Sequence, residues 1–150
     1  MKIRIAGQAD IPQLLQLYRH LNPDDQEVAP AEARDRLERL KLYPGSDIFV
    51  ACLDDAVVAT CTLVVIPNLT RGGAPYALIE NVVTDAAHRK RGYGKAVLGA
   101  ATNAGWQADC YKVMLLTGSK EPATLRFYQN AGFERSKTGF QIRRIPPRAS

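Results

Sequence analysis

A short segment beyond the middle of the chain combines four cations with two glycines, a composition suited to binding phosphate. It consists of Arg89, Lys90, Arg91, Gly92, Tyr93, Gly94 and Lys95. A strand-like run from Tyr76 to Thr84 precedes it and a helix-like run follows it. Backbone N–H groups at a helix start lack partners in the helix and lie at the positive end of its dipole, so they attract phosphate. Glycine lets a ligand approach that backbone closely, because no Cβ intervenes. The pattern predicts a diphosphate-binding loop.

Other interpretations of this segment can be weighed from its residues. A glycine turn with a solvated basic face has the same composition, and it stays open for the segment considered alone. A Walker loop would need a Lys-Ser/Thr pair, which the segment lacks. A dinucleotide fold would need G-x-G-x-x-G and a downstream acid, which are also missing.

Length and composition indicate one packed domain over residues 1–150. Hydrophobic residues make up 46% of the chain, and the net charge of +5 with a pI near 9.3 favours anionic partners. No apolar run approaches the roughly 20 residues that cross a bilayer, and the first residues lack a secretory core, so a cytoplasmic location without a membrane partner is expected. The cysteines are odd in number and widely spaced, which predicts reduced core thiols and no metal site. They are Cys52, Cys61 and Cys110.

Apolar periodicity and turn residues predict the elements that must position the loop. Expected strands are Lys2 to Ile5, Asp47 to Leu53, Val57 to Ile66, Tyr76 to Thr84, Val113 to Leu116 and a terminal hairpin within Phe133 to Ile145. Expected helices begin near Asp10, run from Ala31 to Leu42, extend from Lys95 to near Asp109 and span Pro122 to Asn130. This order predicts a mixed α/β domain.

The chain resembles the GNAT superfamily of N-acetyltransferases. Residues 89–94 match that family's pyrophosphate motif, Arg/Gln-x-x-Gly-x-Gly/Ala. Glu80-Asn81-Val82-Val83-Thr84 looks like its central strand, and Phe127-Tyr128 followed by Ala131-Gly132-Phe133 looks like its distal motif. Cys110-Tyr111-Lys112-Val113 is weakly similar to glucosamine-phosphate acetyltransferases. The resemblance implies a mostly antiparallel mixed sheet of about six to seven strands, a splayed central parallel pair and about four helices on both faces.

The resemblance also implies how acetyl-CoA, the co-substrate, is held. Val82 and Thr84 should flank the pantetheine arm, which pairs with the splayed strand. Many members carry Asn on the loop before the distal helix, where Glu121 stands here. Further expected contacts come from the same loop and helix, namely Ser119, Thr124, Phe127 and Tyr128.

Direct acetyl transfer to an amine in a ternary complex requires a base, a polariser of the carbonyl and a proton donor for the thiolate. Tyr128 matches the family's proton donor, and a phenol, with an ordinary pKa of about 10, keeps its proton at neutral pH; considered alone, it could equally be a core aromatic. Glu80 is the candidate base, because burial in an apolar strand would strengthen a carboxylate as a base. It could instead only order hydrogen bonds or orient substrate. The backbone N–H of Val83 is the expected polariser, by resemblance.

The acceptor, a small-molecule or peptide amine, is expected near residues 21–28, 69–76 and 136–141 by the same resemblance. Acids there, such as Asp24, would favour a cationic amine, whereas Arg71 would favour a phosphate or carboxylate, so both stay open. A CoA-binding module without catalysis is the first alternative. A nucleic-acid-binding domain is disfavoured, because no known motif accompanies the basic residues. A homodimer is expected only by analogy.

Overall fold

A computed structural model of the chain describes residues 1–146, and these divide into two compact units. The first runs from Met1 to Thr117 and the second begins at Gly118. Each unit is described by itself below. Residues 147–150, which include Arg148, lie outside the described part.

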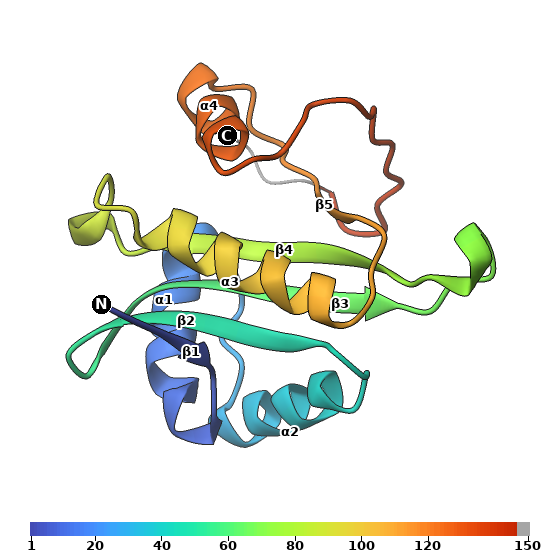
Figure 1. Cartoon of the computed structure of the whole chain (residues 1–150). Coiled ribbons are helices and arrows are strands. Elements are labelled where there is room, and N and C mark those ends of the chain that lie inside the picture. The colour runs from blue at the N-terminus through green and yellow to red at the C-terminus, as the bar shows by residue number, and fades with distance from the viewer. Residues whose placement is uncertain (147–150) are drawn as a thin grey trace. The chain divides into compact units, whose positions relative to one another are not determined.

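The first unit contains five strands and three α-helices, close to the predicted bounds (Figure 1). The strands are β1 (Lys2–Ile5), β2 (Asp47–Leu53), β3 (Ala56–Ile66), β4 (Tyr76–Thr84) and β5 (Val113–Leu115). The helices are α1 (Ile11–Leu21), α2 (Pro30–Lys41) and α3 (Tyr93–Gln107). Short 3-10 turns, η1 (Gln8–Asp10), η2 (Arg71–Gly73) and η3 (Ala86–His88), complete it. These predictions are confirmed, apart from shifts of one or two residues at some ends.

The sheet has the strand order β1-β2-β3-β4-β5. The first four strands pair antiparallel, and β4 pairs parallel with β5. The described part thus has the expected mixed, mostly antiparallel sheet with a parallel pair, but five strands where about six to seven were expected.

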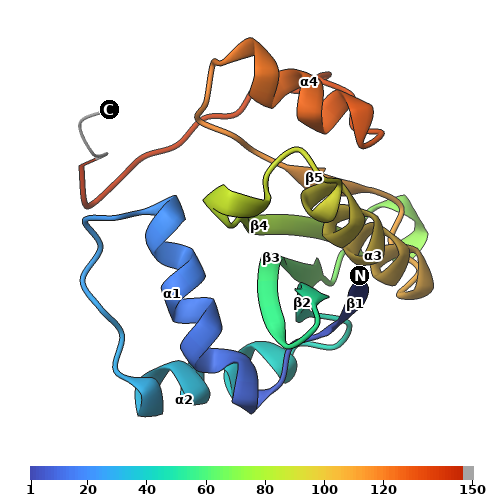
Figure 2. The ribbon, with the colours of Figure 1, turned by 90° about the vertical axis from the view of Figure 1, so that its left-hand side faces the viewer.

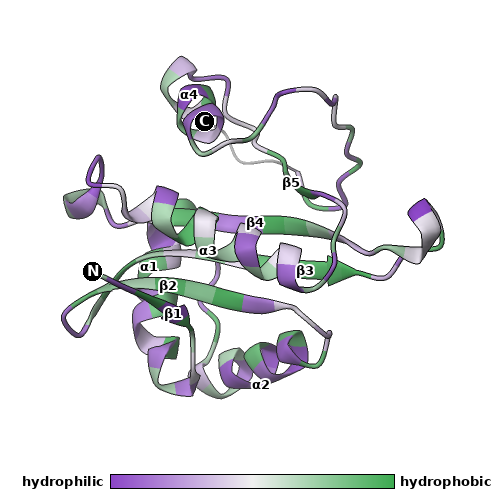
Figure 3. Cartoon of the chain, in the orientation of Figure 1, coloured by the Kyte–Doolittle hydropathy of each residue, from purple (hydrophilic) through white to green (hydrophobic). Residues whose placement is uncertain are grey.

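Helices cover both faces of this sheet, as Figure 2 shows for α1 and α3. On one face, Leu14 and Leu17 of α1 pack with Val50 and Val83. On the other face lies α3, whose Val97, Leu98 and Ala101 are fully buried. The central strands between them carry mostly hydrophobic residues (Figure 3). The core of the first unit is therefore double-layered around β2, β3 and β4.

Small residues let α3 approach the sheet closely, as the sequence predicted. A Cβ added to Gly105 would lie 2.8 Å from Val113 Cγ2, a distance that real Cβ atoms do not show. Any larger residue at position 105 would therefore push α3 away from β5.

The three cysteines are buried and free, which confirms the expected core thiols. Cys61 lies under α3, with its Sγ 3.5 Å from the Val97 carbonyl, and burial raises the pKa of this thiol to about 12. Burial also raises the pKa of Cys110. Neither thiol is a nucleophile at neutral pH.

None of the helices in residues 1–146 is long and apolar enough to cross a bilayer.

The second unit contains α4 (Pro122–Asn130), with the predicted bounds. Pro122 stands at its first turn, and Gly132 follows its end with φ +100°, a conformation that favours glycine. The predicted terminal hairpin is wrong: residues 133–146 form no strand, and Phe140 and Ile142 are almost fully exposed. Apolar residues recur there at Phe140, Ile142 and Ile145, but a strand also needs a neighbour that pairs with its backbone, and no strand within residues 1–146 pairs with this segment.

A partly buried ion pair joins β1 to the start of α1. Arg4 donates from Nη1 and Nη2 to the two carboxylate oxygens of Asp10, at 2.7 and 2.8 Å, and the Gly7 N–H donates to Oδ2 at 2.7 Å. Only 5% of Asp10 is exposed. The hydrogen bonds from Arg4 are the main reason that the pKa of Asp10 lies below its ordinary value.

We expect Asp10→Asn to lower the free energy of unfolding at pH 7 by about 1–3 kcal/mol, below the range for fully buried pairs because Arg4 is partly exposed. The pKa of Asp10 is lower in the folded than in the unfolded protein. The stabilisation by its ion pair is therefore complete at pH values above the unfolded pKa, and it is lost as the pH falls through the folded pKa. Urea unfolding at several pH values measures this, with the exposed turn residue Asp55, changed to Asn, as control. An equal difference between wild type and Asp10→Asn at pH 7 and pH 2 would contradict it.

Candidate functional site

The parallel pair β4–β5 separates halfway along β4. Pairing runs from Ala77 with Val113 to Ile79 with Leu115, where β5 ends. Strand β4 continues for five more residues, to Thr84, without a β5 partner. One edge of residues 80–84 therefore faces away from any strand in the first unit, which is the opening that the resemblance predicted.

A β-bulge lies at the start of this opening. Thr62 pairs with Glu80 and Thr60 with Val83, so Asn81 and Val82 together oppose the single residue Cys61. Asn81 has φ +53°, a left-handed conformation that Asn tolerates better than most residues. The bulge bends β4 and shifts its following residues by one position.

The phosphate loop, residues 89–94, connects β4 and η3 to α3. Lys90 and Gly92 are left-handed, with φ +63° and +85°, and Gly92 is the N-cap of α3. No side chain within residues 1–146 caps this end. The first intrahelical bond runs from the Ala96 N–H to the Gly92 carbonyl at 3.0 Å, so the preceding N–H groups are open to a ligand.

Space and charge at this loop both suit a diphosphate. A Cβ on Gly92 would meet nothing within 4 Å, so the glycine borders open space. The neighbouring cations are exposed and form no ion pair within residues 1–146. They are Arg89, Lys90, Arg91 and Lys95. The residues present therefore fit the pyrophosphate of CoA.

The first unit brings together the β4 residues of the predicted site. Val83 is buried against α1, so only its main chain can face a ligand, and Val82 and Thr84 are half-buried beside it. Glu80 is exposed, so the burial on which its role as a base was predicted is wrong. The face of the sheet that carries Glu80 is not covered there by α1, which the sequence alone could not reveal.

The remaining predicted residues belong to the second unit. Tyr128 contacts Phe127 and Phe133 through ring edges, with centroids 5.1 and 6.5 Å apart. Ser119 donates to Thr124 Oγ1 at 3.3 Å, and its own Oγ accepts the Glu121 N–H at 3.2 Å. Within this unit, Ser119 and Thr124 thus form a hydrogen-bonded pair, and the three aromatic rings form a separate aromatic cluster.

A cluster of two cations and two tyrosines was missed by the sequence analysis. Lys112 Nζ lies 5.5 Å from the ring of Tyr76 and 5.4 Å from that of Tyr111, and Arg71 Cζ lies 5.2 Å from Tyr111. We call these four residues the tyrosine–cation cluster. Neither cation has an acidic partner in the described residues. The adjacent Tyr111 and Lys112 were a signal, but their distance in sequence from Arg71 and Tyr76 hid the cluster.

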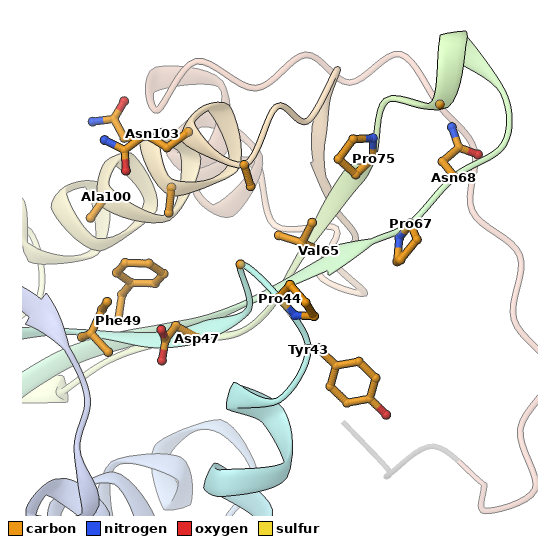
Figure 4. A pocket seen from close by; sticks show the side chains of 16 residues that line it. Tyr43, Pro44, Asp47, Phe49, Val65, Pro67, Asn68, Pro75, Ala100 and Asn103 are labelled. Carbon is orange, nitrogen blue, oxygen red and sulfur yellow. The ribbon is translucent and has the colours of Figure 1, made fainter.

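A groove of about 970 Å³ lies elsewhere in the first unit, between α3 and strands β2 and β3. Figure 4 shows Phe49 and Asn103 on its opposite walls. None of the predicted catalytic or cofactor-binding residues lines it, whereas Gly73 and Pro75 of the expected acceptor segment 69–76 do. We therefore separate this groove from the candidate site, although it is large enough for a ligand.

The fold and the site together define a class of protein. A central strand that leaves its parallel neighbour, and then leads into a basic helix N-terminus, suits an extended ligand that ends in a diphosphate. A comparison with protein families identifies the class: residues 14–133 match the acetyltransferase (GNAT) family, across both units. The chain belongs to this family and is an acetyltransferase.

Individual relatives agree with this assignment. The chain is 30% identical over 135 residues to glucosamine 6-phosphate N-acetyltransferase of Trypanosoma brucei brucei, covering 89% of this chain and 88% of that protein. A solved acetyltransferase structure from Agrobacterium tumefaciens is 50% identical, with a TM-score of 0.90, covering 96% of this chain and all of the other. Glucosamine-6-phosphate N-acetyltransferase of Arabidopsis thaliana, 22% identical, shares the fold with a TM-score of 0.87 over 96% of this chain and 98% of the other.

Proposed function

We propose that the chain, as one acetyltransferase domain, transfers the acetyl group of acetyl-CoA directly to a primary amine in a ternary complex. The observation that carries this proposal is the edge of residues 80–84 that pairs with no strand of the first unit, and that leads into the open N-terminus of α3. The edge can pair with the pantetheine arm as an added strand would. The phosphate loop then holds the pyrophosphate through backbone N–H groups and Arg89, Lys90, Arg91 and Lys95.

The proposed roles of the reacting groups follow the order of the chemistry. The acceptor amine attacks the thioester carbonyl, whose developing negative charge is stabilised by the Val83 N–H. Glu80, exposed on the uncovered face, takes the amine proton directly or through water. Tyr128 donates its proton to the departing thiolate, so that the products are an amide and free CoA.

The tyrosine–cation cluster supports an acceptor that carries an anionic group. Side chains alternate along β4, so Tyr76 and Glu80 lie on the same face of the sheet. Lys112 reaches this face beside Tyr76. One strip of the sheet thus presents the Glu80 carboxylate for an amine and, beside Tyr76, cations for an anion. We propose an amino sugar phosphate as the acceptor, the class named for the relatives from Trypanosoma and Arabidopsis.

The test of this function is free-thiol release from acetyl-CoA with a panel of amines. The panel contains an amino sugar phosphate, the same amino sugar without phosphate, polyamines and peptides. We expect fastest turnover with the phosphorylated sugar. Turnover with peptides alone would contradict the proposed acceptor, and CoA binding without turnover on any amine would favour the binding-module alternative.

We expect Lys112→Ala to raise the KM for the amino sugar phosphate about 10- to 100-fold, since a hydrogen bond to a charged group contributes about 1.5–3 kcal/mol. The kcat should change little, because the contact is the same in the ground and transition states. The KM for the sugar without phosphate should stay unchanged. Lys2→Ala, on the opposite edge strand, is the matched control. An equal rise in both KM values would remove Lys112 from anion recognition.

A further inference from the structure

Two histidines share one carboxylate beside the phosphate loop. His88 Nδ1 lies 2.6 Å from Asp85 Oδ2, and His20 Nε2 lies 3.1 Å from Asp85 Oδ1. The carboxylate accepts both bonds, so the histidine N–H groups donate. We call these three residues the histidine–aspartate chain. Within residues 1–146 no three His, Cys, Asp or Glu side chains are arranged to hold a metal ion, so this is a hydrogen-bonded chain.

The histidine–aspartate chain joins three elements of the first unit. Asp85 is fixed to β3, because its N–H donates to the Val58 carbonyl at 2.8 Å, and it caps η3 by accepting the Ala87 N–H at 3.2 Å. His20 belongs to the last turn of α1. His88 ends η3, directly before the phosphate loop. The end of α1 and the entry to the loop therefore share one anchor.

The anchor also contacts the other end of the loop. The ring of His88 makes an edge-to-face contact with the ring of Tyr93, the first residue of α3. The ring centroids lie 6.2 Å apart and the ring planes are at 71°. His88 and Tyr93 flank residues 89–92. Fixing His88 thus restrains the loop at both of its ends.

The loop needs such restraint for a physical reason. It holds two left-handed residues, Lys90 and Gly92, lacks a side-chain cap, and carries like charges that no acid in residues 1–146 pairs with. Like charges repel, which favours an open loop when no anion is bound. A loop already fixed in its bound conformation loses less entropy on binding.

A cavity of about 220 Å³ borders the histidine–aspartate chain and shows what surrounds it. Its other walls come from α1 and β3 and are neutral: Gln13, Gln16, Leu17, Ala56, Val57 and Val58. Asp85 is the one carboxylate among the described residues that line it. The bond from His88 is the main reason that the pKa of Asp85 is lowered, so the carboxylate is ionised at neutral pH.

We propose that Asp85, His20 and His88 are positioning residues that hold the phosphate loop in its CoA-binding conformation. This inference rests on the proposed function for its effect on CoA, but not for its effect on the loop. The same carboxylate also ties down the end of α1, which leads into residues 22–28 of the expected acceptor region. Loss of the histidine–aspartate chain loosens the phosphate loop and weakens CoA binding without slowing the chemical step.

The test is Asp85→Asn in the full chain. We expect a roughly tenfold higher Kd for CoA by calorimetry, equivalent to one charge-assisted hydrogen bond. Amide hydrogen exchange in residues 89–94 should be faster without any ligand, and kcat at saturating acetyl-CoA should stay within about twofold. Asp35→Asn, which removes a carboxylate paired with Arg36 and Arg39 on α2, is the matched control. If residues 89–94 of Asp85→Asn exchange their amide hydrogens at the wild-type rate, the inference is overturned.

A second pair of variants guards against general destabilisation. His20 bonds only Asp85 in this cluster, whereas Asp85 also bonds His88 and the Ala87 N–H, so replacing His20 removes fewer contacts. His20→Leu should weaken CoA binding and speed exchange in the loop, whereas His20→Gln should restore both, because its amide can donate to Asp85 as the ring does. Equal behaviour of the two variants would contradict a positioning role. If wild type itself fails to bind CoA, the proposed function is wrong, and the ligand-free exchange data alone still decide about the loop.

Discussion

Replacing Tyr128 with Phe should lower kcat about 10²- to 10⁴-fold, the usual contribution of a general acid. The reason is chemical, because the variant lacks only the hydroxyl that we propose protonates the thiolate. The ring edges that contact Phe127 and Phe133 remain, so α4 should keep its packing. The Kd for CoA should change little. Steady-state thiol release at saturating acetyl-CoA, together with calorimetric CoA binding, measures both effects.

The matched control for this prediction is Tyr43→Phe. Tyr43 is 60% exposed and lines the groove, which no proposed catalytic or cofactor-binding residue lines. The same loss of a phenolic hydroxyl should there leave kcat unchanged. A Tyr128→Phe variant as fast as wild type would remove Tyr128 from the mechanism, and a comparable loss in Tyr43→Phe would attribute the effect to folding.

Local signals explain which elements were predictable from the sequence. Helix α4 had Pro122 at its first turn and Gly132 after its end, and the structure has the predicted bounds. Strand β4 is apolar and lies between a glycine-containing loop and a polar turn, and its bounds also match. The phosphate loop was predictable for the same reason, since glycines, cations and a helix start are neighbours in the chain.

Features that depend on distant contacts were not predictable in this way. The exposure of Glu80 depends on which part of the sheet α1 covers, and apolar neighbours in the strand do not reveal that. The bond from His20 to Asp85 joins residues on α1 and after β4. The hairpin expected within residues 133–145 required a strand to pair with, and no local pattern specifies such a neighbour.

Replacing Gly92 with Val should have the largest effect on CoA binding, raising the Kd by at least about tenfold. Two physical causes act together. Gly92 has φ +85°, a conformation that costs a residue with a Cβ about 1–2 kcal/mol. Its Cβ would also enter the open space beside the α3 N-terminus, where we propose that the pyrophosphate lies. The strain should lower stability, and the added side chain should block the backbone approach.

Gly73→Val separates these two causes. Gly73 has φ +84° and nothing within 4 Å of an added Cβ, so it carries nearly the same strain in open space, but it lies before β4. Both variants should therefore lose similar stability in thermal unfolding. Only Gly92→Val should also lose affinity in a calorimetric CoA titration. If both variants bind CoA equally well, the phosphate loop does not hold the pyrophosphate. If only Gly92→Val loses affinity for CoA, the close approach of the pyrophosphate to the backbone at position 92 accounts for the binding, because the backbone strain is common to both variants.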